Sequence, residues 1–139
     1  MLLTGIYESG FGSATRALAE QKGPLHRHGV PGADRWHDGT INIRLQQVVK
    51  VIAPDHAIVR RVHDARGRLA LSLLTLVRCR LVHAAFETDE AFLYRWDPSA
   101  HPLNVLEVAC PLQTGLVHGD TVQLLVRDGA LRLIASVQG

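Results

Sequence analysis

Lysine is almost missing from this chain of 139 residues, in which only Lys22 and Lys50 stand beside thirteen arginines. A nucleotide site of the Walker type needs a lysine directly after a glycine-rich loop. Neither lysine has that position, so this class of site is excluded. Acidic residues nearly balance the basic ones, and the net charge of +2 does not by itself indicate a nucleic-acid partner.

Cysteine and long apolar runs are also scarce. Cys79 and Cys110 have no CxxC partner and lie in apolar, strand-like segments, which favours two reduced core thiols over a disulfide or a metal site. No apolar run approaches the ~18 residues of a membrane span. No basic segment leads into a long apolar run near Met1, so we expect no signal peptide. The sequence therefore predicts a soluble, cytoplasmic protein without a membrane partner.

The residues that are present have the composition of one ordinary globular domain over 1–139, with 47% apolar and 20% charged residues. One helix is predicted over 13–22, ended by Gly23-Pro24 and followed by a loop to residue 38. Asp128-Gly129 predicts a hairpin between the last two strands. Short strands at close spacing favour a small β-barrel over a parallel α/β sheet. The predicted strands are 2–9, 40–45, 48–53, 57–62, 69–82 (long enough to require a bend), 91–96, 105–109, 121–126 and 131–137.

Two segments could bind phosphate or a cation. Glycines before the predicted helix, in the segment 8–15, would let backbone N–H groups approach a phosphate, although a plain strand-to-helix turn explains them equally well. In the strand 40–45, Thr40 and Asn42 share one face. Their neutral oxygens suit Mg²⁺ when phosphates balance its charge. In isolation this pattern is more typical of exposed polar surface.

Three further patterns could mark functional residues or could be ordinary surface positions. Glu107 lies within an apolar strand, so it faces either a polar cavity or solvent. His26, His28 and His37-Asp38 have the spacing of a loose transition-metal cluster, but a solvated loop is the favoured interpretation. The basic pairs at 60–61 and at 78 and 80 could contact phosphate, and a solvated face is again favoured.

Taken together, the segments 8–15, 38–45 and 99–111 resemble the archaeal CTP-dependent riboflavin kinases. That family has a Gly-rich S-G-L-G-E-G loop, a helix, a G-T-L-N motif, a T-x-H segment, an L/I-E-x-I-A-P strand and a K-D-G-D-x-V hairpin. The corresponding residues here are Ser9–Gly12, Gly39–Asn42, Ser99–His101, Leu106–Pro111 and Val117–Val122. The resemblance covers roughly residues 3 to 127, and its specificity comes from the order of the motifs.

The resemblance implies a small six-stranded cradle-loop barrel with one short helix after the first strand. It implies transfer of the CTP γ-phosphate to the 5′-hydroxyl of riboflavin, which gives FMN and CDP. Thr40 and Asn42 would hold Mg²⁺, while Ser99 and Glu107 would contact the flavin. The nucleotide would be bound by Gly10, Phe11, Gly12, Ser13, Ala14 and Thr15, and by Leu112, Gln113, Thr114 and Gly115.

The chain departs from the family mainly at the nucleotide positions. Ser13-Ala14 replaces Glu-Gly, and the segment 112–115 lacks the basic residue of the family. A different phosphoryl donor, or a non-catalytic barrel that binds a flavin or nucleotide, is therefore the second hypothesis. A DNA-binding or partner-binding barrel is the third, and the low net charge argues against it. No general base is assigned.

Overall fold

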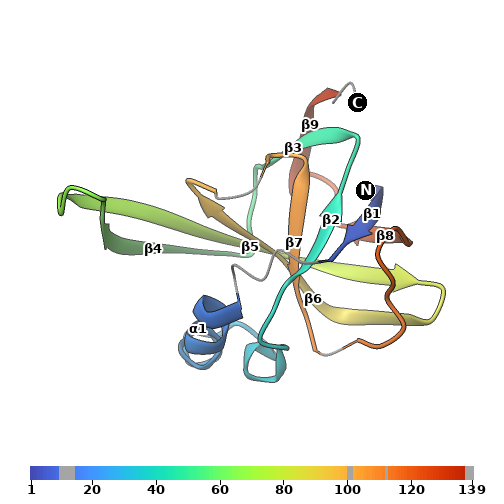
Figure 1. Ribbon diagram of the computed structural model, residues 1–139, viewed down its shortest axis with the longest axis horizontal. Coiled ribbons are helices and arrows are strands. Elements are labelled where there is room, and N and C mark those ends of the chain that lie inside the picture. Colours follow the sequence, from blue (N-terminus) through green and yellow to red (C-terminus); the bar gives the residue numbers. More distant parts are fainter. Residues whose placement is uncertain (10–14, 100–101, 112, 137–139) are drawn as a thin grey trace.

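The computed structural model describes residues 1–9, 15–99, 102–111 and 113–136, without the side chains of residues 15–17 and 135. Within these ranges the protein is mostly β, with one α-helix and one short 3₁₀ helix (Figure 1). No described helix is long and apolar enough to cross a membrane. The elements are β1 (Leu2–Glu8), α1 (Thr15–Arg27), η1 (Ala33–Arg35), β2 (Ile41–Arg44), β3 (Gln47–Val51), β4 (His56–His63), β5 (Leu69–His83), β6 (Phe86–Asp97), β7 (Val105–Ala109), β8 (Thr121–Val126) and β9 (Leu131–Ser136).

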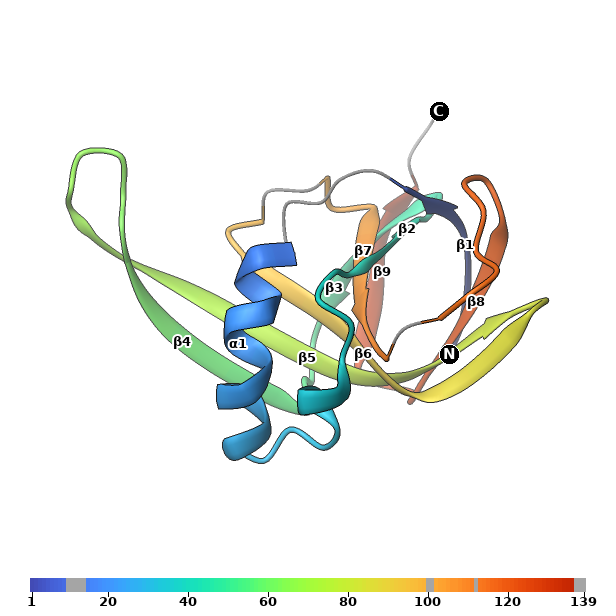
Figure 2. The ribbon, with the colours of Figure 1, turned by 60° about the horizontal axis from the view of Figure 1, so that its bottom comes forward.

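Six antiparallel strands close into a ring. Its order is β5-β6-β7-β2-β1-β8, and the pairing of β8 with the end of β5 completes the circuit. Figure 2 shows these strands curving around a common interior. β3 and β9 pair with each other as a separate two-stranded sheet. The mostly β fold expected from the strand pattern is thus present.

β4 and the first half of β5 extend away from the ring as a two-stranded arm (Figures 1 and 2). Eight consecutive residue pairs join them without a register shift, from His56–Leu76 to His63–Leu69. The turn at the tip is fixed by Asp64, whose Oδ1 accepts hydrogen bonds from the N–H groups of Arg66 and Arg68. The long predicted strand 69–82 is therefore one strand that belongs to both the arm and the ring.

Side-chain alternation divides the buried apolar residues into two clusters. The ring core lies inside the ring and includes Ile43, Leu93, Leu106, Val108 and Leu124. The helix core lies between α1 and the outer face of the ring, and it contains Leu18, Leu25, Val30, Ala33, Trp36, Leu74, Leu76, Phe92, Tyr94 and Ala109. Both thiols, Cys79 and Cys110, are buried in the ring core and unbonded.

The helix differs from its prediction because packing overrides the Gly23-Pro24 signal. α1 continues to Arg27, and η1 interrupts the loop expected over 23–38. Leu25, one residue beyond the proline, is 5% exposed in the helix core, and its burial outweighs one missing backbone hydrogen bond. The helix is instead followed by Gly29 at φ +94°, a conformation that glycine adopts without strain.

The hairpin predicted at Asp128-Gly129 is wrong, although a turn is present there. β9 leaves this turn to pair with β3 and not with β8. The reason is that β8 has no edge left, since it pairs with β1 on one side and with β5 on the other. Local turn chemistry could not reveal that both edges of the preceding strand are occupied.

Two glycine substitutions should change stability in opposite directions. A Cβ at Gly5 would lie 2.5 Å from Ile43 Cγ2 and 2.8 Å from the Arg44 carbonyl oxygen, so Gly5→Ala should cost about 1–3 kcal/mol. At Gly23, in α1, the nearest atom is the flexible Arg27 Nη1 at 3.4 Å. Gly23→Ala should therefore stabilise the protein by about 0.5–1 kcal/mol. Urea unfolding of both variants tests this; equal stability of Gly5→Ala and the parent protein would contradict the packing of β1 on β2.

Candidate functional site

A row of polar side chains crosses the outer face of the ring. Asn42 on β2 lies opposite Glu107 on β7, and Glu107 lies opposite Tyr94 on β6. On its other side Asn42 lies opposite Glu8 of β1. Four neighbouring strands thus contribute one polar residue each, whereas the residues that precede and follow Asn42 and Glu107 are apolar and pack with the ring core. We call Glu8, Asn42, Glu107 and Tyr94 the polar row.

The middle of the polar row is buried. Asn42 is 5% exposed and Glu107 9%, and they are the two polar residues among the buried side chains of the described chain. Glu107 thus points outward from the ring but is covered from solvent. Its environment combines features of the two alternatives, a polar cavity and an outward position, that its place in the sequence left open. Burying a carboxylate costs free energy unless it is hydrogen-bonded.

Thr40 supplies one of these hydrogen bonds. Its Oγ1 donates to Glu107 Oε1 at 3.1 Å, although 66 residues separate them in the sequence. Asn42 Oδ1 is buried and has no hydrogen-bond partner among the described residues. An orphaned amide oxygen in such a place calls for a donor or a cation. Three residues singled out from two separate motifs, Thr40 and Asn42 from one and Glu107 from the other, therefore meet at one point.

The donor atoms around this point are all oxygens. Besides the hydroxyl, the amide and the Glu107 carboxylate, Glu8 contributes a carboxylate that is held by Arg44 through an ion pair. This set suits a hard cation such as Mg²⁺. No three His, Cys, Asp or Glu side chains in the described ranges are grouped as a metal site, so such a cation would also need oxygens from a ligand.

Tyr94 ends the row beneath α1. Its hydroxyl donates to Gln21 Oε1 at 2.6 Å and accepts from Trp96 Nε1 at 2.8 Å. Burial, opposed in part by the hydrogen bond from Trp96, raises the pKa of Tyr94 to about 12. The helix is thereby tied to the same face of the ring that carries Asn42 and Glu107.

A cavity of about 250 Å³ opens beside Thr40. Gln113 and Gly115, from the second segment expected to bind nucleotide, line it together with Thr40. Gly115 has a φ of +93°, and a Cβ there would lie 3.0 Å from Ala85 Cβ. Tyr7 and His37 line the cavity as well. The candidate cation ligand and part of the candidate nucleotide segment thus share one hollow.

Lys22 lies close to this site, a position that sequence reasoning missed. Its Nζ is 2.5 Å from Asp38 Oδ1 and donates to the Trp36 carbonyl oxygen at 3.1 Å. Asp38 comes two residues before Thr40, so a lysine on α1 supplies positive charge beside the candidate site. The helix predicted to end at residue 22 gave no reason to place this side chain there. Glu8 was missed for a similar reason, because its register opposite Asn42 depends on the closed ring.

The remaining predicted residues are more dispersed. Ser99 lines a different cavity of about 270 Å³, together with Arg95 and Trp96. Thr114 is exposed, and Thr15 is the first residue of α1. The other nucleotide positions, Gly10, Phe11, Gly12, Ser13, Ala14 and Leu112, lie outside the described residues.

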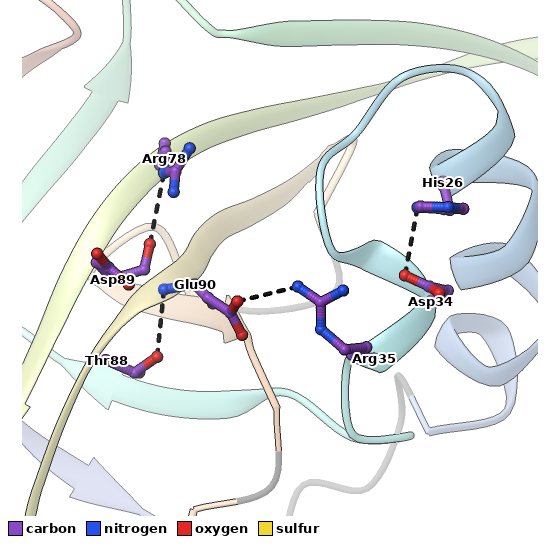
Figure 3. Close-up of polar contacts among 7 residues, drawn as sticks. All are labelled: His26, Asp34, Arg35, Arg78, Thr88, Asp89 and Glu90. Atoms are coloured by element: carbon purple, nitrogen blue, oxygen red, sulfur yellow. Dashed lines mark hydrogen bonds and ion pairs between the residues drawn. The ribbon is translucent and has the colours of Figure 1, made fainter.

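The histidine and arginine patterns form ordinary surface contacts (Figure 3). His26 Nδ1 lies 3.2 Å from Asp34 Oδ1, and His28 and His37 are exposed. Arg78 Nε donates to the Asp89 carbonyl oxygen at 3.4 Å, and Arg80 pairs with Glu87. Neighbouring residues thus hold His26, Arg78 and Arg80 in surface contacts, whereas the pair Arg60-Arg61 is exposed.

No protein-family model matches the chain, and no curated protein matches it. The geometry of the polar row and its motifs therefore carry the functional argument.

The raised pKa of Tyr94 predicts a loss of stability in alkali. Because the pKa is higher in the folded state than its ordinary value of 10, the neutral phenol stabilises the fold fully below pH 10, and this contribution disappears as pH rises to about 12. Over this interval the free energy of unfolding of the parent protein should fall. In Tyr94→Phe it should fall by up to about 2 kcal/mol less. Burial also raises the pKa of Cys79 and Cys110 to about 12, but these thiols are common to both proteins. Equal falls in the free energy of unfolding of the two proteins between pH 10 and 12 would contradict the burial of Tyr94.

Proposed function

We propose that this chain is a riboflavin-kinase-like phosphotransferase, which transfers the γ-phosphoryl group of CTP to the 5′-hydroxyl of riboflavin and releases FMN and CDP. One observation carries the proposal. Thr40, Asn42 and Glu107 are the positions that the resemblance assigns to metal and flavin. They are neighbours: Thr40, directly before β2, is hydrogen-bonded to Glu107 on β7 at 3.1 Å, and Asn42 on β2 lies opposite Glu107.

The architecture supports the same function. A ring of six antiparallel strands, with one α-helix and one short 3₁₀ helix between β1 and β2 among the described residues, is compatible with the small cradle-loop barrel of the resembled family. α1 follows β1 directly along the chain, as the family order requires. We propose that the ring is a member of this barrel class.

The residues on the polar row fit a magnesium ion. Thr40 Oγ1 and Asn42 Oδ1 would hold it, with the carboxylates of Glu8 and Glu107 nearby to balance its charge. When bound, Mg²⁺ would offset the negative charge of the nucleotide phosphates. Asn42 Oδ1 is the strongest support for this assignment, because it is buried without another described partner.

Thr40 and Glu107 would position the two substrates relative to each other. By donating its proton to Glu107, the Thr40 hydroxyl keeps its oxygen lone pairs available for a cation. The same hydrogen bond fixes the Glu107 carboxylate, which would hold the flavin. Transfer requires the 5′-oxygen to form a bond to the γ-phosphorus while the bond to the CDP oxygen breaks and the hydroxyl proton leaves. Such reactions depend mainly on positioning and charge.

The nucleotide would enter the cavity beside Thr40. Gln113 and Gly115 line this cavity. Asp38, which lies between two of the lining residues in the sequence, forms an ion pair with the ammonium group of Lys22. Lys22 of α1 would thus replace the basic residue that the segment 112–115 lacks. This assignment agrees with the expectation that loops, and not the lysine of a Walker motif, bind the phosphates.

The test is FMN formation from riboflavin, Mg²⁺ and CTP, followed by chromatography, with ATP in a parallel reaction. Thr40→Val and Asn42→Ala should each lower turnover by about 10²-fold or more, because they remove groups that position charge. Thr88→Val is the matched control, since Thr88 lies on β6 and its hydroxyl accepts from the Glu90 N–H, away from the polar row (Figure 3). Absence of FMN with both nucleotides would contradict the kinase proposal.

Flavin binding is measured separately by quenching of riboflavin fluorescence. Glu107→Gln should weaken this binding by about tenfold, since a charged hydrogen-bond acceptor is replaced by a neutral amide. Asn42→Ala should leave flavin affinity intact. Quenching without turnover in the parent protein would select the non-catalytic flavin-binding alternative.

A further inference from the structure

The arm carries a concentration of positive charge that the rest of the molecule lacks. Residues 56–76 contain four arginines and one aspartate, a net charge of +3, whereas the whole chain has +2. Asp64 is engaged by Arg68 at the turn. Arg60 and Arg61 on β4 are exposed and form no ion pair with any described acidic residue. The projecting part of the protein is thus basic, and the rest is slightly acidic.

One face of the arm is also apolar and exposed. Leu69, Leu71 and Leu73 alternate along β5 with exposures of 61%, 62% and 36%, and Val59, opposite Leu73, is 64% exposed. Arg61 and His63 lie on the same face, opposite Leu71 and Leu69. A contiguous exposed apolar row of this kind is typical of an interaction surface.

β4 provides a free edge beside this row. It is the terminal strand in the order β4-β5-β6-β7-β2-β1-β8, and no described strand pairs with its other side. Its eight residues contain no proline and pair with β5 without a bulge. Of the features that usually prevent an edge strand from pairing with another chain, β4 therefore has charged side chains alone.

That charge discriminates between occupants. If β4 paired along its length with β4 of a second copy, two-fold symmetry would place Arg60 of each copy directly or diagonally across from Arg60 of the other on the same face. Like charges on facing strands destabilise a sheet. A strand with acidic side chains would instead form opposite-charge pairs there. Nucleic acid would neutralise the arginines but would leave the leucine row uncovered.

We propose that the outer edge of β4 is a docking site for an extended segment of a partner protein, in which acidic residues alternate with apolar ones. The segment adds a strand to the arm through backbone hydrogen bonds. Its acidic side chains pair with Arg60 on one face of the sheet. Its apolar side chains, on the other face, lengthen the row formed by Val59 and the three leucines. This surface lies on β4 and β5, whereas the polar row lies on β1, β2, β7 and β6. Burial raises the pKa of Tyr94 at the end of that row, and the charge of Arg60 lowers it in part.

The probe is a peptide of the same eight-residue length as β4, in which Glu alternates with Val, titrated into the ¹⁵N-labelled full chain. We expect saturable chemical-shift changes confined to β4 and its neighbours on β5. Arg60→Glu/Arg61→Glu should weaken binding by about tenfold or more. Arg27→Glu/Arg132→Glu is the matched control, with the same change in net charge at exposed sites on α1 and β9.

Several results would overturn the proposal. These are no binding of the Glu–Val peptide, equal binding of a Lys–Val peptide, and equal losses in the two double variants. Shift changes outside the arm would do the same. Preferential binding of a DNA duplex or of phosphatidylserine vesicles to the same arm residues would assign the surface to those partners and reject strand addition. A circular dichroism spectrum of each variant confirms that it is folded before titration.

Discussion

The pairing of β8 with the end of β5 is the constraint on which the rest of the structure depends. Four residue pairs, from Cys79–Val126 to Val82–Gln123, convert an open antiparallel sheet into a ring. Closure separates an inner face, filled by apolar side chains, from an outer face that is free to carry polar ones. It also occupies both edges of β8, so β9 must find its partner in β3. The site, the two cores and the small second sheet all follow from this closure.

The sequence predicted the strands well because each is a local pattern. Alternation and turn residues placed 105–109 and 121–126 at the bounds that the structure has, and most others within a few residues. The helix end and the Asp128-Gly129 hairpin could not be predicted. Both depend on tertiary contacts, the burial of Leu25 in one case and the occupied edges of β8 in the other. The continuity of β5 through arm and ring is likewise a property of its three partner strands.

For the site, the sequence identified residue types and the structure supplied their neighbours. Thr40, Asn42 and Glu107 were chosen from motif chemistry, and the register of β2 on β7 places them together. Glu8 and Lys22 were not chosen, because their proximity depends on ring closure and on a helix longer than the local signal indicates. Ser99 lines another cavity, and its proposed role depends on how a flavin would span the distance to Glu107.

The position of β1 in the ring has a consequence for how the chain folds. β1 is the first strand of the chain, and its partners are β2 and β8, which begins at residue 121. Contacts between such distant segments carry a large loop-closure entropy and slow the folding of β proteins. During synthesis, one edge of β1 therefore has no partner until residues 121–126 have left the ribosome. The protein must pass through an open-sheet stage in which the apolar interior of the future ring is accessible, and this stage is where it is most exposed to aggregation.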